Sequence, residues 1–132
     1  MRAAILCVDD ESVILESLEM QLEHHFDAQY LMEFAENAEE AMEILNELEG
    51  EGISVLVIIS DWLMPGMKGD EFLIKAHKLF PHIVKIMLTG QADQEAIDRA
   101  RRDADLFECI YKPWKAEELI STIEKALNKF ED

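Results

Sequence analysis

The segment SVLVIISDWLMPGMKG, residues 54–69, decides how the rest of the chain is organised. Residues 54–60 are uncharged and rich in β-branched side chains, which predicts a strand buried on both faces. Asp61 follows at once, and Pro65 and Gly66 then predict a turn. A carboxylate at the end of a buried strand is either an acidic turn residue or a group with a chemical role. The sequence of the neighbouring segments distinguishes between these two interpretations of Asp61.

Short apolar segments alternate with amphipathic ones along the whole chain. Strands are predicted at 3–8, 29–35, 54–60, 83–88 and 106–111. Helices are predicted at 12–26, from Asn37 to Gly50, from about Gly69 to Pro81, at 93–102 and at 115–130. Parallel strands need right-handed crossovers, so five strand–helix units predict a three-layer α/β fold, a doubly wound (βα)5 parallel sheet. No linker interrupts residues 1–132, and we expect one domain.

The composition restricts the partners. The chain has 29 acidic and 12 basic residues and a formal net charge of −17, which argues against direct binding to nucleic acid or to an anionic membrane. No apolar segment is long enough to span a bilayer, and the run at 3–8 is too short for a secretion signal. Both cysteines lie in apolar runs, which indicates free thiols and a reducing compartment. We therefore expect a cytoplasmic protein.

Polar side chains follow four of the five predicted strands. Ligands of open α/β sheets bind beyond the carboxyl ends of the strands, so these side chains are expected to converge. They are Asp9-Asp10-Glu11 after the first strand, Asp61 after the third, Thr89-Gly90 after the fourth and Lys112-Pro113 after the fifth. Each residue alone is commonplace in a turn or a helix cap. Their occurrence at successive strand ends indicates one site.

Such a cluster predicts phosphoryl chemistry with a metal ion. Carboxylates held close together repel one another unless cations join them, and Lys112 supplies only one positive charge. Oxygen ligands and bound water suit Mg²⁺, with Mn²⁺ as a substitute. A carboxylate beside such an ion can attack phosphorus and form an aspartyl phosphate, while the lysine neutralises charge on the transferring group. Thr89 could then hydrogen-bond the attached phosphoryl group.

Four motifs resemble the receiver domain of two-component response regulators, the CheY-like superfamily. They are VDDE at 8–11, SDWLMPGMKG at 60–69, MLTG at 87–90 and YKPW at 111–114. The resemblance covers essentially the whole chain and implies the flavodoxin-like strand order 2-1-3-4-5. LTGQAD together with KPW also resembles receivers fused to cyclic-di-GMP phosphodiesterases (HD-GYP) or to hybrid kinases, which is a weaker likeness.

The resemblance implies a role for each site residue. Asp61 accepts a phosphoryl group from a sensor histidine kinase, from a phosphotransfer protein of a phosphorelay or from a small phosphodonor. Asp10, Asp61 and the backbone carbonyl of Leu63 bind Mg²⁺ directly, and Asp9 helps through a metal-bound water. Lys112 pairs with the phosphoryl group. Its bond to Pro113 is usually cis in the family.

The resemblance also implies a signalling route. Thr89 moves towards the phosphoryl oxygen, and the face formed by the fourth helix, the fifth strand and the fifth helix changes. An output domain, a partner protein or a second copy in a homodimer reads that face. Cys109 stands where the family usually has a rotating aromatic residue, so the common route from threonine to aromatic is in doubt. Leu63 stands where polar residues are frequent and could keep water from the phosphoryl group.

The chain is thus interpreted as a switch rather than an enzyme acting on external substrates, and three alternatives stay open. A phosphorylation-independent interaction module would be expected to lack the acid pair, the acceptor or the lysine. A Mg²⁺-dependent phosphohydrolase would typically carry a second acid two residues after its nucleophile, where this chain has Leu63. A slow phosphorelay intermediate is the third. Trp62 and Trp114 are expected to flank the crevice, and Arg99, Arg101 and Arg102 to form a basic patch, either solvated or contacting a partner.

Overall fold

The computed structural model describes residues 2–91 and 93–131, so residue 92 of the LTGQAD motif lies outside the described part. The strands are β1 (Ala3–Val8), β2 (Leu31–Ala35), β3 (Ser54–Asp61), β4 (Val84–Thr89) and β5 (Glu108–Tyr111). The helices are α1 (Ser12–Phe26), α2 (Ala38–Gly50), α3 (Gly69–Leu79), α4 (Gln94–Ala104) and α5 (Ala116–Leu127), and a 3₁₀ turn, η1 (Asn128–Phe130), follows α5. The predicted alternation of strands and helices is confirmed.

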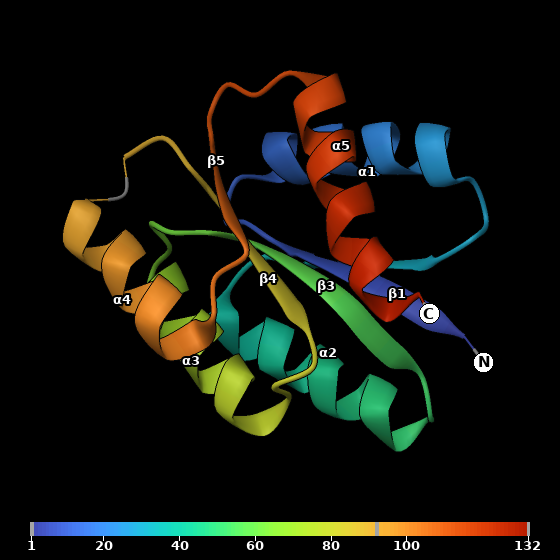
Figure 1. Ribbon diagram of the computed structural model, residues 1–132, viewed down its shortest axis with the longest axis horizontal. Coiled ribbons are helices and arrows are strands. Elements are labelled where there is room, and N and C mark those ends of the chain that lie inside the picture. Colours follow the sequence, from blue (N-terminus) through green and yellow to red (C-terminus); the bar gives the residue numbers. More distant parts are fainter. Residues whose placement is uncertain (1, 92, 132) are drawn as a thin grey trace.

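All five strands pair in parallel in the order β2-β1-β3-β4-β5, with β3 at the centre (Figure 1). This is the flavodoxin-like order that the family resemblance implied. Helices α1 and α5 cover one face of the sheet, and α2, α3 and α4 cover the other. Each face has its own apolar core, which is why the central strands are apolar on both sides rather than alternating.

Several boundaries differ from the sequence-based prediction by one or two residues, and local turns explain two of them. β2 begins at Leu31 rather than at 29, because the backbone N–H of Gln29 donates to the carbonyl of Phe26 in a turn after α1. β5 begins at Glu108 rather than at 106, because the N–H of Leu106 still closes the end of α4 on Ala100. The last predicted helix divides into α5 and the 3₁₀ turn.

The end of β3 is held directly against the start of α3. The backbone N–H of Gly69 donates to the carbonyl of Trp62 at 2.7 Å, which closes the loop 62–68 at its base. A Cβ atom on Gly69 would collide with the carbonyl oxygen of Asp61 and lie 2.8 Å from the Cα of Trp62. Glycine is therefore required here for close approach of two backbones. This contact fixes where Asp61 sits relative to α3.

We predict that Gly69→Ala lowers the free energy of unfolding by about 3 kcal/mol or more, because the clash is with backbone atoms that cannot swing aside. Urea unfolding followed by circular dichroism measures the change. Gly50→Ala is the matched control, since a Cβ there meets nothing within 4 Å. The control is expected to leave stability unchanged or to raise it by up to about 1 kcal/mol. Equal stability of the two variants would contradict this account of the loop.

Candidate functional site

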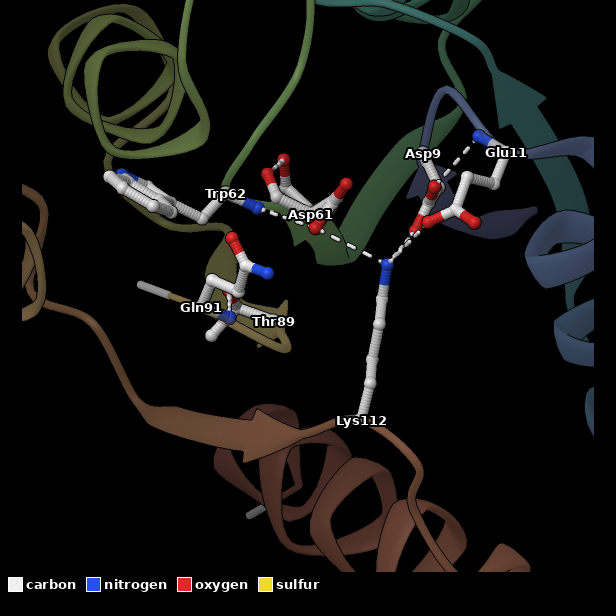
Figure 2. A network of polar contacts seen from close by, with 8 residues as sticks. Asp9, Glu11, Asp61, Trp62, Thr89, Gln91 and Lys112 are labelled. Carbon is white, nitrogen blue, oxygen red and sulfur yellow. Dashed lines mark hydrogen bonds and ion pairs between the residues drawn. The ribbon is translucent and has the colours of Figure 1, made fainter. Parts of the chain in front are cut away.

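The carboxyl ends of β1, β3, β4 and β5 meet in one cleft, as the strand-end pattern predicted (Figure 2). The cleft has a volume of about 500 Å³. Its lining includes Asp10, Asp61, Leu63, Thr89 and Lys112. Asp9 lies directly behind it and contacts Lys112. Parallel pairing is what brings these ends together, because every strand of such a sheet ends on the same edge.

Asp61 is the last residue of the central strand, and only 5% of its surface is exposed. Its Oδ1 atom accepts a hydrogen bond from the backbone N–H of Trp62 at 2.9 Å and lies 3.3 Å from Nζ of Lys112. Burial and the nearby charge of Asp9 raise the pKa of Asp61 to about 6, although Lys112 and the Trp62 N–H oppose the rise. Asp61 is therefore ionised at neutral pH, and the positive charge near it does not balance the effects of burial and of Asp9.

Lys112 is the cation shared by the carboxylates. Its Nζ donates to Oδ2 of Asp9 at 2.8 Å and lies 3.5 Å from a carboxylate oxygen of Glu11, besides its contact with Asp61. Burial lowers the pKa of Lys112, but the hydrogen bond to Asp9 and the charges of both aspartates outweigh it, so the net pKa is raised. Lys112 therefore stays protonated, and its ammonium group contacts both Asp9, which follows β1, and Asp61, which ends β3.

Asp9 is completely buried, and both of its oxygens have partners. Oδ1 accepts from the backbone N–H of Glu11 at 2.8 Å, and Oδ2 accepts from Lys112. Burial nevertheless raises the pKa of Asp9, against these favourable contacts. Sequence reasoning placed Glu11 among the acids but gave it no role, whereas the structure brings it into contact with Lys112.

Four carboxylates could share a metal ion. One oxygen each of Asp9, Asp10, Glu11 and Asp61 can be chosen so that all lie within 4.8 Å of one another. Asp10 and Glu11 are exposed, whereas Asp9 and Asp61 are buried. An all-oxygen set with excess negative charge and access to water fits a hard divalent cation such as Mg²⁺. Leu63 lines the same cleft, with half of its surface exposed.

Thr89 and Lys112 are held by the neighbouring ends of β4 and β5. The backbone N–H of Lys112 donates to the carbonyl of Thr89 at 2.9 Å, and the hydroxyl of Thr89 accepts from the N–H of Gln91 at 3.1 Å. Gln91, which stands in the LTGQAD motif but was given no role from the sequence, also lines the cleft. The peptide bond between Lys112 and Pro113 is cis, the isomer that the family resemblance implies.

Neither tryptophan lines the cleft, although Trp62 follows Asp61 and Trp114 stands two residues after Lys112. Trp62 is buried in the core beneath α3 and α4, and Figure 2 shows its indole turned away from Lys112. Trp114 donates its indole N–H to Gln21 of α1 at 2.8 Å. Cys109 of β5 is half-buried against the core on the α4 side, and burial raises the pKa of its thiol.

The fold and the cleft together define a doubly wound α/β domain with an acidic, lysine-containing site at the carboxyl edge of its sheet. The family model described as the response regulator receiver domain matches residues 5–124, and the chain belongs to this family. Members of the family generally function as signalling switches that phosphorylation activates. Its members bind Mg²⁺ at an acidic cluster, and this chain has such a cluster.

Curated relatives share this domain as part of longer proteins. The chain is 32% identical over 126 residues to the hydrogenase transcriptional regulatory protein HoxA of Cupriavidus necator, covering 96% of this chain and 24% of that protein. It is 31% identical over 127 residues to the sensor kinase CckA of Brucella abortus, covering 96% of this chain and 13% of that protein. The chain thus spans about a quarter or less of these relatives.

Solved structures with the same fold are similar over nearly their whole length. The signal receiver domain of an HD domain-containing protein from Pseudomonas fluorescens Pf-5 superposes with a TM-score of 0.87 at 30% identity, covering 98% of this chain and 97% of that one. A response regulator receiver domain protein from Clostridium thermocellum gives a TM-score of 0.83 at 32% identity, with 96% and 95% covered. Among the described residues, no helix combines the length and apolar character needed to cross a membrane.

We predict that Asp61→Asn raises the free energy of unfolding at pH 7 without divalent ions by about 2 kcal/mol. The pKa of Asp61 rises from 3.8 to about 6 on folding. The folded state therefore binds the extra proton between these values, and wild-type stability falls as pH rises through that window. The gain from Asn should vanish below pH 4, where the acid is protonated in both states.

Urea titrations from pH 3.5 to 7.5 measure this difference, and Asp98→Asn, which removes an exposed acid on α4, is the control for loss of a surface charge. Added Mg²⁺ should stabilise wild type and reduce the advantage of Asp61→Asn, because it binds the folded acidic cluster. An Asp61→Asn variant less stable than wild type at pH 7 without metal would contradict the electrostatic account.

Proposed function

We propose that this chain is a phosphorylation-activated switch that accepts its phosphoryl group on Asp61. The proposal is carried by one observation: the carboxylate at the end of the central strand lies 3.3 Å from Lys112, and three further carboxylates lie close enough to share a metal ion with it. A raised pKa, to about 6, leaves Asp61 ionised at neutral pH and unusually basic for an aspartate, which suits a nucleophile.

The transfer is a displacement at phosphorus. An oxygen of ionised Asp61 forms the new O–P bond while the N–P bond of a donor phosphohistidine breaks, and the released imidazole nitrogen keeps the electron pair and takes a proton. Lys112 neutralises negative charge on the moving group, and the Thr89 hydroxyl donates to it once it is attached. Asp10, Asp61 and the Leu63 carbonyl would hold Mg²⁺ or Mn²⁺, with Asp9 contributing through water. The bound ion supplies positive charge beside the phosphoryl oxygens.

The donor is a sensor histidine kinase, a phosphotransfer protein or a small phosphodonor. Residues 1–132 act as one receiver unit whose α4–β5–α5 face controls an output domain or partner protein, with dimerisation through that face as one means of control. Curated relatives support an attached output, since one is named a transcriptional regulator and another a sensor kinase. We place the protein in the cytoplasm, a setting consistent with its free cysteines, Cys7 and Cys109.

Acetyl phosphate with Mg²⁺ should add the mass of one phosphoryl group to the wild-type protein, as intact-mass spectrometry will show. Asp61→Asn should abolish the adduct, because an amide cannot act as the nucleophile. Asp98→Asn, an exposed acid on α4, is the matched control and should phosphorylate like wild type. Persistence of the adduct in Asp61→Asn would refute the assignment of the acceptor.

The other classes make different predictions in the same experiment. A phosphorylation-independent interaction module would form no adduct in wild type. A phosphohydrolase would turn over a simple phosphate ester in wild type and not in Asp61→Asn. Leu63 argues against turnover, because the position two residues after the acceptor offers no acid to activate water.

Leu63 predicts a long-lived phosphoprotein. Its half-exposed apolar side chain lines the cleft with Asp61 and limits the approach of water to the acyl phosphate. We expect Leu63→Asn to shorten the phosphoprotein half-life severalfold, because an amide can hydrogen-bond an attacking water. The half-life is measured by mass spectrometry after removal of acetyl phosphate, and Leu79→Asn, an exposed leucine at the end of α3, serves as control. An unchanged half-life would show that Leu63 does not shield the site.

A further inference from the structure

A buried carboxylate outside the cleft connects the site to α4. Asp70 lies in the first turn of α3, with only 1% of its surface exposed. Its Oδ1 accepts the indole N–H of Trp62 at 3.0 Å, and its Oδ2 accepts Nη1 of Arg99 at 2.5 Å. One oxygen therefore holds the residue that follows Asp61, and the other holds a helix 29 positions further along the chain.

Trp62 ties this carboxylate to the site. Its backbone N–H donates to Oδ1 of Asp61, and its carbonyl accepts from Gly69, so the peptide groups on both sides of Trp62 are held by hydrogen bonds. Trp62 as a whole residue is 8% exposed, and it belongs to the same core cluster as Ile97 of α4. Close packing leaves such a ring little room, so a shift of the Trp62 peptide has to be passed to its surroundings.

Arg99 is the partner on α4. Its side chain is 44% exposed, whereas that of Asp70 is 2% exposed, so the pair closes the boundary between α3 and α4 from the solvent side. The basic patch expected from the sequence is thus divided: Arg102 pairs with its neighbour Asp103, while Arg99 reaches across to α3. A buried carboxylate without its cation is costly, which makes the position of Arg99 depend on that of Asp70.

We propose that Asp70 is a positioning residue that couples the state of Asp61 to the placement of α4, through Trp62 on one side and Arg99 on the other. This inference rests on the proposed phosphorylation of Asp61. Esterification moves charge from the carboxylate to the phosphoryl oxygens, and a hydrogen bond to a charged acceptor is about twice as strong as one to a neutral acceptor. The hydrogen bond from the backbone N–H of Trp62 to Asp61 therefore weakens on phosphorylation, and the change reaches α4 through Asp70.

The route explains how a chain with Cys109 in place of an aromatic residue can still signal. It runs through the α3 side of α4 and uses no side chain of β5. Coupling between two sites is reciprocal. If the state of Asp61 alters the conformational equilibrium of α4, breaking the contacts at the α4 end has to alter ligand affinity at Asp61. Loss of the contacts at Asp70 is therefore expected to change both the ligand affinity of the site and the response of α4.

The test compares Asp70→Asn, Arg99→Gln and the conservative Arg99→Lys with Arg102→Gln, a control that removes an α4 charge whose ion-pair partner among the described residues is its neighbour Asp103. Each variant is made in a Trp114→Phe background, so that fluorescence reports Trp62 alone. Trifluoroberyllate with Mg²⁺ is titrated as a mimic of the phosphoryl group, and amide NMR shifts of Ala96, Ile97 and Ala100 report α4.

We expect Asp70→Asn and Arg99→Gln to change the affinity for trifluoroberyllate by about threefold or more, and to lose most of the α4 shift. Arg99→Lys should restore part of both, and Arg102→Gln should match its background. Wild-type shifts and affinity in Asp70→Asn and Arg99→Gln would overturn the inference while leaving phosphorylation of Asp61 intact. Failure of wild type to form the acetyl phosphate adduct would overturn the proposed function itself, and the inference with it.

Discussion

The repulsion between carboxylates at the carboxyl edge of the sheet is the interaction on which the site depends. Asp9 and Asp61 are buried and end adjacent strands, and burial raises the pKa of both. Lys112 is the side chain that contacts both of them within the described residues. One ammonium cannot balance four carboxylates, so the site remains short of positive charge. A divalent cation and a phosphoryl group together can make up that deficit.

The sheet topology makes this unfavourable cluster possible. β3 is buried on both faces, so apolar packing stabilises the strand against the unfavourable acid at its end. The contact of Gly69 with the backbone of Asp61 and Trp62 holds the acceptor loop from the α3 side, while the pairing of Lys112 with Thr89 holds the opposite wall. Two apolar cores thus support a charged edge whose groups are placed by strands and not by a flexible loop.

Signalling requires that the site and a distant surface share a change. In this chain the half-buried Cys109 offers no aromatic ring to move, whereas Trp62, Asp70 and Arg99 form a continuous polar connection to α4. The connection begins at Trp62, whose backbone N–H donates directly to the carboxylate of the acceptor. The carboxylate of Asp70 is buried and has both oxygens engaged, a condition under which small displacements cannot be absorbed by solvent.

The sequence by itself determined the five strand–helix units and the residues at the strand ends. Apolar runs such as 54–60 have a clear period, and parallel strands deliver their carboxyl ends to one edge, so Asp9, Asp61, Thr89 and Lys112 could be grouped without coordinates. The predicted starts of β2 and β5 were wrong because the first residue of each predicted strand forms a hydrogen bond in the turn after the preceding helix. Tertiary structure alone decided the direction of Trp62 and the burial of Asp70. An acid in a first helical turn is ordinary, and partners 8 and 29 residues away leave no periodic trace in a sequence.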